Sequence, residues 1–445
     1  MNFAYLRKLI KQSLRRMNNK QFTFIDLFAG AGGLSEGFIR AGFTPIAHIE
    51  MNQDACNTLK TRAAFHYLKA EGKLSVYEDY LKNKVEKTDG TDLWSKVPKN
   101  ITEKVICAAI GEKTIGDIFF NVDKLKGSRC VDIIIGGPPC QAYSVAGRAR
   151  MGKDVENDPR NELYKYYVRF LERYNPRMFV FENVLEILTA KRGEPFADLK
   201  RLVEELGYKM DCKVQIASEH GVLQDRHRVI IVGWKDDQFK DYSYPILEKE
   251  SMPYAVMKDL FSDLPLRKAG EGNLCGIVSY TKPLSEMKYL KESGIRGVLS
   301  FTTQHVARPT NDNDRQIYKI AVDLWLKNKQ RLNYAKLPPQ LQTHNNKKSF
   351  LNRFNVVNPF GCCHTVVAHI AMDGHYYIYP TPNPTVDTVR SITVREAARL
   401  QSFPDDYFFE GSRTAVLRQI GNAVPVVLAY KIAEKIKEKL GDNFF

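Results

Sequence analysis

Residues 24–33 read Phe-Ile-Asp-Leu-Phe-Ala-Gly-Ala-Gly-Gly, an apolar run that ends in a glycine-rich turn. The apolar run predicts a buried strand, and the residues from about Leu34 onward predict a helix. A glycine turn between a strand and a helix lets the backbone approach a ligand closely, at the carboxyl end of the strand. The stretch therefore predicts an α/β protein with a ligand site at this turn, the alternative being a tight turn that binds nothing.

The same alternation of apolar strands and amphipathic helices continues over residues 21–234. Helices are expected at Leu163–Tyr174 and Phe196–Leu206. Strands are expected at Phe22–Phe28, Thr44–Ile49, Val131–Ile135, Met178–Phe181 and Val229–Val232. Alternation of this kind predicts a doubly wound, mostly parallel sheet. Several of these strands are continuous Val, Ile and Phe runs, as expected for strands covered on both faces.

The rest of the chain predicts three further segments. Residues 235–389 lack clear periodicity and predict a second, loop-rich domain, and residues 390–445 are expected to return to the first domain. Within that last segment, Thr393 followed by Glu396 predicts a capped helix start, and a final helix begins near Val424. Residues 69–114 are polar and weakly patterned, and predict an insertion at the rim of the sheet. Residues 1–20 form a basic amphipathic extension, for which a mitochondrial presequence is the alternative.

Charge and composition limit the class of protein. The 445 residues include 66 Lys and Arg against 51 Asp and Glu, a formal net charge of +15, which indicates nucleic acid or an acidic membrane surface as partner. A hydrophobic content of 44% excludes wholesale disorder, and no apolar run reaches the roughly 18 residues of a membrane helix. The eight cysteines are scattered, as in a protein of the reducing cytoplasm.

An adenosine-containing cofactor is expected at the glycine turn. Glu50 lies twenty residues after Gly30 and ends the next strand, where a carboxylate can accept hydrogen bonds from ribose hydroxyls. Ser35 stands where a dinucleotide-binding fingerprint has its third glycine. This departure disfavours an NAD-dependent dehydrogenase.

A candidate nucleophile follows another strand, in Gly136-Gly-Pro-Pro-Cys-Gln-Ala-Tyr-Ser144. Two prolines stiffen the chain before Cys140, which lies just beyond the carboxyl end of the strand. A cysteine on a constrained turn has the exposure that a nucleophile needs. The other cysteines lack this context and are interpreted as small apolar residues.

Charged side chains are expected beside this cysteine. Glu182 ends the strand Met178–Phe181 and is a candidate proton donor, with helix capping as the alternative. Arg226 and Arg228 alternate at a strand entry, so we expect both to point to the same side, where a guanidinium can bind a carbonyl or phosphate. The basic loop 146–161 is interpreted as a lid over a phosphate backbone, or else as a plain solvated loop.

No metal site is expected. Two cysteines and three histidines lie close together in the sequence, at Cys362, Cys363, His364, His369 and His375. Adjacent cysteines fit zinc spacing poorly, and the chain has no C-x-x-C motif. The residues between His364 and His369 predict a strand with polar ends.

Taken together, the segments resemble the motifs of the DNA cytosine-5 methyltransferases of bacterial restriction–modification systems. Six motifs occur in the family's order over nearly the whole chain. They are Asp26–Gly33, Gly137–Gln141, Glu182–Val184, Gln224–Arg228, Arg395–Pro404 and Gln419–Pro425. Residues 235–389 fall where the family has its target-recognition domain, and the fold implied is that of S-adenosylmethionine-dependent methyltransferases. The departures are the insertion and the N-terminal extension.

The resemblance implies a role for each matched residue. Cys140 would attack carbon 6 of a flipped-out cytosine, Glu182 would bind its ring nitrogen 3 and amine, and Arg228, with Arg226, would bind its carbonyl oxygen. The cofactor S-adenosylmethionine, leaving as S-adenosylhomocysteine, would contact Phe28, Gly30, Gly32, Gly33, Glu50, Asp117, Pro138, Asn422 and Ala423. Candidate DNA contacts are Gln141, Ser144, Arg148, Arg160, Arg308, Arg315, Arg353 and Thr365.

The function expected is methyl transfer to carbon 5 of cytosine in a specific double-stranded DNA sequence, in the bacterial cytoplasm and associated with the nucleoid. The expected partners are duplex DNA and a separately acting restriction endonuclease, with no membrane association and a monomeric state. A transfer RNA substrate is disfavoured because residues 235–389 are long for that branch of the family. A non-catalytic DNA-binding protein on the same fold is the remaining alternative.

Overall fold

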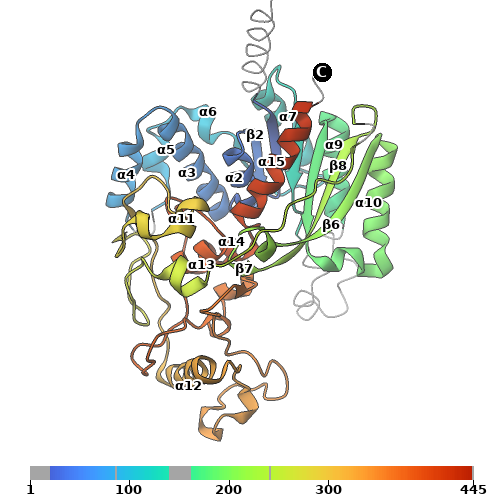
Figure 1. The fold of residues 1–445 in the computed structure, drawn as a ribbon. Helices are drawn as coiled ribbons and strands as arrows, with labels where there is room; N and C mark the ends of the chain where they lie inside the picture. The colour runs from blue at the N-terminus through green and yellow to red at the C-terminus, as the bar shows by residue number, and fades with distance from the viewer. Residues whose placement is uncertain (1–20, 86–87, 140–161, 240–241, 443–445) are drawn as a thin grey trace, which may run out of the picture.

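The computed structural model describes residues 21–85, 88–139, 162–239 and 242–442 (Figure 1). A seven-stranded sheet forms its centre, in the order β3-β2-β1-β4-β5-β8-β6. β8 runs antiparallel to β5 and to β6, and the other neighbouring strands are parallel. The strands are β1 (Thr23–Leu27), β2 (Thr44–Glu50), β3 (Val105–Cys107), β4 (Ile133–Gly136), β5 (Met178–Asn183), β6 (Tyr208–Ile216) and β8 (His227–Lys235). The predicted doubly wound, mostly parallel sheet is confirmed.

Two strands of this sheet, β3 and β6, are not predicted by the sequence pattern. β3 has three residues and lies inside the stretch 69–114, so interpreting that whole stretch as an insertion was wrong at its carboxyl end. Three residues are too few to establish a pattern. β6 is the edge strand, and most of its side chains are exposed or half-buried. Its sequence, Tyr-Lys-Met-Asp-Cys-Lys-Val-Gln-Ile, therefore mixes polar and apolar residues and lacks the apolar run that predicts a buried strand.

Helices cover both faces of the sheet. On one face, apolar residues of α2 and α15 pack against β1 and β4, and on the other, α7, α9 and α10 pack against β1, β4 and β5. The predicted helix at 163–174 is confirmed at both ends. The helices are α2 (Gly33–Arg40), α3 (Gln53–Ala70), α4 (Leu74–Asn83), α5 (Thr91–Trp94), α6 (Lys99–Thr102), α7 (Ile115–Lys126), α9 (Leu163–Tyr174), α10 (Glu194–Glu205), α11 (Lys288–Glu292), α12 (Asp312–Asn328), α13 (Val394–Leu400), α14 (Arg413–Asn422) and α15 (Val426–Asp442).

The carboxyl-terminal segment returns to the sheet, as the sequence predicts. The capping box at the start of α13 is confirmed, because Thr393 accepts from the amide of Glu396 and the Glu396 carboxylate accepts from the amide of Thr393. α15 then packs so closely on α2 that a Cβ added to Gly37 would lie 2.4 Å from the Cβ of Ala429. Glycine is therefore required at this helix crossing.

The buried apolar residues of 235–389 lie mainly in two clusters, whereas Phe239, Tyr244 and Leu247 join the core of the sheet and Cys275, Leu299 and Phe301 pack with α4. Residues of the segment 256–295 share a core with α13 and α14, so this part packs with the carboxyl-terminal segment. A second cluster contains Tyr318 of α12, Tyr334, Phe354 and Ile378, and we call the region around it (residues 312–356 with 375–389) the α12 unit. Figure 1 shows α12 at the end of the molecule away from the sheet. Short strand pairs also occur, formed by β9 (Ile277–Ser279) with β10 (Phe301–Thr303) and by β7 (Gln224–Asp225) with β11 (Cys363–His364).

The polar insertion that precedes β3 has a core of its own. α4 and α5 bury Tyr77, Leu81 and Leu93 in a cluster that also contains Phe301 and Phe408. The insertion therefore packs against both the segment 235–389 and the carboxyl-terminal segment. Among the helices that the structure describes, none is both long enough and apolar enough for a membrane span.

Candidate active site

The glycine turn after β1 opens on one side and is closed on the other. The amide of Gly30 donates to the Glu50 carboxylate at the end of β2, over 2.8 Å. A Cβ added to Gly30 would meet no atom within 4 Å, so space for a ligand lies beside it. A Cβ on Gly33 would instead lie 2.3 Å from the carbonyl oxygen of Val424. The turn thus joins Glu50 to the carboxyl-terminal segment and keeps one open face.

A tyrosine from the carboxyl-terminal segment supports this turn from beneath. The buried hydroxyl of Tyr407 donates to the carbonyl oxygen of Ala31 over 2.5 Å. The Arg62 guanidinium lies 4.7 Å from the Tyr407 ring centroid and pairs with Glu36 (2.6 Å) and Asp406 (2.8 Å). Burial alone would raise the pKa of Glu36, but Arg62 and the neighbouring His66 hold it well below its usual range.

The turn after β4 lies against β1 and β5. A Cβ on Gly136 would lie 2.3 Å from the carbonyl oxygen of Leu27, and one on Gly137 would lie 2.6 Å from Oε2 of Glu182. The Asn183 side chain donates to the carbonyl oxygen of Pro138 over 3.3 Å. Both glycines are therefore required by close neighbours, and the residues that lead to Cys140 lie directly beside Glu182.

Glu182 and Arg228 form an ion pair at the carboxyl end of β5. Oε1 of Glu182 lies 2.9 Å from Nε of Arg228, and the two side chains are each 13% exposed. The pairing follows from the antiparallel register, in which Glu182 lies opposite Ile230, two residues beyond Arg228 on β8. A nearly buried carboxylate and guanidinium can together bind a flat polar group that offers both a donor and an acceptor.

Arg226 is more deeply buried than Arg228, and it lies within electrostatic reach of both Arg228 and Glu182. The strand is interrupted between β7 and β8 at this residue. The Arg226 guanidinium is fully buried and donates to the carbonyl oxygens of Val366 (2.7 Å) and Gly421 (3.4 Å). Burial, reinforced by the charge of Arg228, lowers the pKa of Arg226.

Buried side chains of the motifs also connect β7 with the carboxyl-terminal segment. Gln224 donates to Oε1 of Gln401 (3.0 Å) and accepts from the amide of Val366 (2.8 Å). Gln401 in turn donates to the carbonyl oxygens of Ile420 (2.8 Å) and Ala423 (3.3 Å). These glutamines hold Ala423 and Val424 against the glycine turn.

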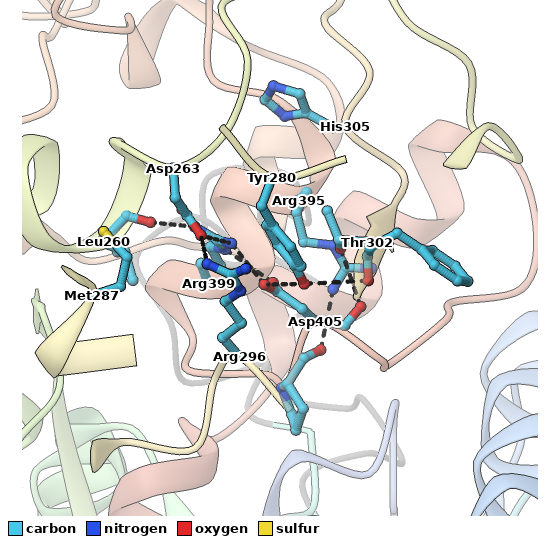
Figure 2. A network of polar contacts seen from close by, with 12 residues as sticks. Leu260, Asp263, Tyr280, Met287, Arg296, Thr302, His305, Arg395, Arg399 and Asp405 are labelled. Atoms are coloured by element: carbon cyan, nitrogen blue, oxygen red, sulfur yellow. Dashed lines mark hydrogen bonds and ion pairs between the residues drawn. The ribbon is translucent and has the colours of Figure 1, made fainter. Parts of the chain in front are cut away.

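A buried ion network joins the segment 256–296 to α13 (Figure 2). The Arg399 guanidinium pairs with Asp263 (2.6 Å) and with Asp405 (2.6 Å), and all three residues are 2% exposed or less. Tyr280 donates to Asp405 over 3.0 Å, and Arg296 approaches Asp263 at 3.3 Å. Arg399 therefore fixes how the segment 256–296 lies on the carboxyl-terminal segment.

Two predicted cofactor residues lie at the edge of this site. Asp117 is in the first turn of α7, with an exposed side chain, and among the described residues no hydrogen bond or ion pair joins it to the glycine turn. Asn422 ends α14 and is exposed, and the following Ala423 lies 3.1 Å from an added Cβ on Gly33. Ala423 thus lies against the turn, and its contact with a cofactor stays a prediction. Phe28 begins the turn with a positive φ of 57°.

The candidate DNA contacts in residues 235–389 bond largely within the protein. Arg308 donates to the carbonyl oxygens of residues 370–372, and Arg353 to those of Asn346, Ser349 and Phe350. Thr365 donates to the carbonyl oxygen of Asp225 over 2.6 Å. Arg315 pairs with Asp312 of the same helix.

The expected strand between His364 and His369 was wrong in position. β11 comprises Cys363–His364, because these residues pair with β7, and a 3-10 turn begins at Ala368. The His364 ring stacks on Tyr377 with ring centroids 5.0 Å apart, and burial lowers its pKa to about 4. In the part of the chain that the structure describes, no group of three or more His, Cys, Asp or Glu side chains is arranged to hold a metal ion.

Several predicted residues lie outside the described residues. They are the extension 1–20, Cys140, Gln141, Ser144, Arg148 and Arg160, together with the rest of the expected lid. Their predicted roles come from the sequence alone.

Periodicity and motif matching missed the supporting residues. Tyr407 and Arg62 could not be predicted as supporting residues, because a tyrosine or an arginine within a helical or loop sequence has no distinguishing local pattern. Gln401 lies inside a matched motif, but its position in the sequence does not show which carbonyl groups it bonds.

The sheet order, the glycine turn at its switch point and the acid–base pair at the adjacent strand ends are typical of the S-adenosylmethionine-dependent methyltransferase fold. Comparison with known families gives a more specific result. The family model of the C-5 cytosine-specific DNA methylases matches residues 22–89 and 92–438, and the chain belongs to this family. It is therefore a C-5 cytosine DNA methyltransferase.

Individual relatives resemble the chain over nearly its full length. The type II methyltransferase M.Bpa9945I of Bacillus paralicheniformis is 38% identical over 94% of this chain and 99% of its own. The type II methyltransferase M.AgeI of Thalassovita gelatinovora is 30% identical over 93% of this chain and 98% of its own. A crystal structure described as a DNA modification methyltransferase encoded within an E. coli prophage aligns with 94% of this chain and 99% of its own, at 22% identity. The TM-score of 0.59 supports the fold.

Proposed function

We propose that this protein transfers a methyl group from S-adenosylmethionine to carbon 5 of a cytosine that is flipped out of a specific duplex DNA sequence. The observation that carries the proposal is the ion pair of Glu182 with Arg228, directly beside the turn that leads to Cys140. A base inside a duplex is out of reach of such a pair, so the cytosine must leave the stack.

The glycine turn fits the proposed cofactor. Open space beside Gly30 would admit the ligand, and the Glu50 carboxylate retains acceptor capacity for ribose hydroxyls besides its bonds to the amides of Gly30 and Asn52. Phe28, Gly32, Pro138 and the Asn422–Ala423 pair would complete this site, together with Asp117 in the first turn of α7. When bound, S-adenosylmethionine supplies an electrophilic methyl group.

The residues of the chain would then act on the base in successive steps. The thiolate of Cys140 forms a bond to carbon 6, and the electron pair of the 5,6 double bond moves so that carbon 5 becomes nucleophilic. Glu182 holds a proton at ring nitrogen 3 and accepts from the amine, which neutralises the charge that develops on the ring. Arg228 donates to the carbonyl oxygen. After methylation, a base removes the proton from carbon 5 and the bond to Cys140 breaks.

Arg226 is proposed to act through its neighbours and not on the base, since its guanidinium is buried between Val366 and Gly421. We assign target recognition to residues 235–389. Gln141, Ser144, Arg148 and Arg160 remain proposed DNA contacts from the sequence.

A place in a type II restriction–modification system is part of the proposal, because the relatives above are named as type II methyltransferases. A separately acting endonuclease with the same target sequence is the partner this implies. We propose a cytoplasmic location at the bacterial DNA.

The test is to incubate the protein and a Cys140→Ala variant with mixed-sequence duplex DNA and methyl-labelled S-adenosylmethionine, and then to sequence the DNA for 5-methylcytosine. Label in the DNA from the parent protein only, within one sequence motif, is the expected result. Methyl transfer by the Cys140→Ala variant would show that Cys140 is not the nucleophile. Cofactor binding without DNA labelling would contradict the proposed substrate, and the assay repeated with RNA would distinguish an RNA substrate from a non-catalytic role.

A further inference from the structure

One stretch of the recognition region is suited to a polyanion. Between Asp323 and Asp373 the chain has seven Lys or Arg residues and no Asp or Glu. Within it, residues 345–350 are all exposed, and they include Lys347 and Lys348. An acid-free basic stretch with exposed lysines attracts phosphate groups.

An aromatic ring stands at the end of these exposed residues. Phe350 is 72% exposed, and its φ is +53°. A bulky side chain adopts this left-handed conformation only where the surrounding structure holds it there. The ring of Phe350 therefore lies in water close to Lys347 and Lys348 along the chain, where it is accessible to the same partner as the lysines.

Hydrogen bonds within the turn supply the constraint. Oδ1 of Asn346 accepts from the amides of Lys348 (3.1 Å) and Ser349 (2.9 Å). The Arg353 guanidinium donates to the carbonyl oxygens of Asn346 (2.5 Å), Ser349 (2.7 Å) and Phe350 (3.0 Å). The turn therefore has one defined shape.

Arg353 also fixes the turn to the α12 unit. It is 8% exposed, and its guanidinium lies 4.4 Å from the ring centroid of the buried Tyr334. That ring stacks on Phe354 with centroids 5.9 Å apart. Arg353, expected from sequence to contact DNA, is thus a positioning residue for the turn 346–350.

We propose that the turn 346–350 contacts duplex DNA, with Phe350 against the bases and Lys347 and Lys348 on backbone phosphates. Apolar side chains that enter a DNA groove and pack on base steps occur in other DNA-binding proteins, and lysine contacts with phosphates position such elements. The inference rests on the proposed function, because it takes duplex DNA as the substrate.

The test compares three variants of the full chain with the parent. They are Phe350→Ala, the double variant Lys347→Gln/Lys348→Gln, and Phe120→Ala as the matched control, since Phe120 is 71% exposed but lies on α7. Binding is measured by fluorescence anisotropy at several salt concentrations. One duplex carries the sequence that the parent methylates, and a second is a scrambled duplex of the same length.

Phe350→Ala is expected to weaken binding to the target duplex by about tenfold or more, with a smaller loss on the scrambled duplex and an unchanged salt dependence. The lysine variant is expected to weaken both duplexes alike and to lower the slope of log affinity against log salt by about two. Phe120→Ala should bind as the parent does, and Phe350→Trp should retain the parent's affinity because it keeps an aromatic face.

Equal binding by Phe350→Ala and the parent would overturn the role of Phe350, and an unchanged salt slope in the lysine variant would overturn the phosphate contacts. Cofactor affinity and the unfolding midpoint, measured on each variant, show whether it is folded. Failure of the parent to methylate or bind any duplex would instead refute the proposed function, and this inference with it.

Discussion

The hydroxyl of Tyr407 donates to the carbonyl oxygen of Ala31 over 2.5 Å, which joins the carboxyl-terminal segment to the glycine turn 376 residues earlier in the chain. The ring of Tyr407 is buried among Phe403, Phe409 and the Arg62 guanidinium. The shape of the glycine turn therefore depends on a buried residue of the carboxyl-terminal segment.

Tyr407→Phe is expected to raise the dissociation constant of S-adenosylmethionine by about three- to tenfold, because the buried carbonyl of Ala31 loses its donor. Isothermal titration calorimetry measures the change. Tyr77→Phe is the matched control, since the Tyr77 hydroxyl is also buried and donates to a backbone carbonyl, that of Asp406, over 2.8 Å. Equal cofactor affinity in both variants would show that Tyr407 supports the fold and not the turn.

Glu182→Gln is expected to slow methyl transfer by about 10²-fold or more, because an amide cannot supply the proton that the ring nitrogen needs. The rate is measured under single-turnover conditions, with cofactor affinity as the check that the site is intact. Glu186→Gln, four residues along the chain, is the control and should transfer at the parent rate. A Glu182→Gln rate equal to that of the parent would remove the residue from the proposed chemistry.

Arg399→Met should destabilise the protein by about 3–5 kcal/mol, because the carboxylates of Asp263 and Asp405 lose their shared cation in a buried site. Urea unfolding followed by tryptophan fluorescence measures the change. Arg201→Met removes an exposed arginine that also pairs with two carboxylates, and it should change stability little. Adding Asp263→Asn and Asp405→Asn to Arg399→Met should recover part of the loss, and no recovery would argue against a charge effect.

The free energy of unfolding is expected to fall as the pH falls from 6.5 toward 4. Burial lowers the pKa of His305 to about 4, and that of His364 to about 4, against 6.5 for an ordinary histidine. In this window the unfolded chain takes up protons that the folded protein excludes, so the contribution is fully present above pH 6.5 and is lost on acidification. Each histidine can contribute up to about 1.4 kcal/mol per pH unit.

His305→Gln tests this expectation. The amide retains a donor for the carbonyl oxygen of Pro265, which His305 contacts over 2.8 Å, but it does not titrate. The variant should show a smaller pH slope than the parent in urea titrations between pH 4 and 6.5. His369→Gln, at an exposed position, is the control. A His305→Gln slope equal to the parent's would contradict the assignment.

Much of the fold and of the candidate site could be predicted from local pattern. Buried central strands are rich in apolar residues, so β1, β2, β4, β5 and the antiparallel β8 could be found, whereas the short β3 and the edge strand β6 could not. Matched motifs led to Glu182 and Arg228, which the structure pairs. The motifs also led to Arg226, but its position in the sequence does not show that its guanidinium bonds the carbonyl groups of Val366 and Gly421.

The sequence by itself determined the alternation of the central strands and helices, the glycine turn and the residues that could carry the chemistry, because burial and turn geometry impose local sequence patterns. The tertiary structure alone decided which distant groups meet. It placed Tyr407 under Ala31, set Arg399 between two carboxylates and turned Arg353 inward to hold the turn 346–350. Such pairings depend on how separate elements pack, and a guanidinium or hydroxyl has the same local sequence context whether it bonds a buried carbonyl or faces solvent.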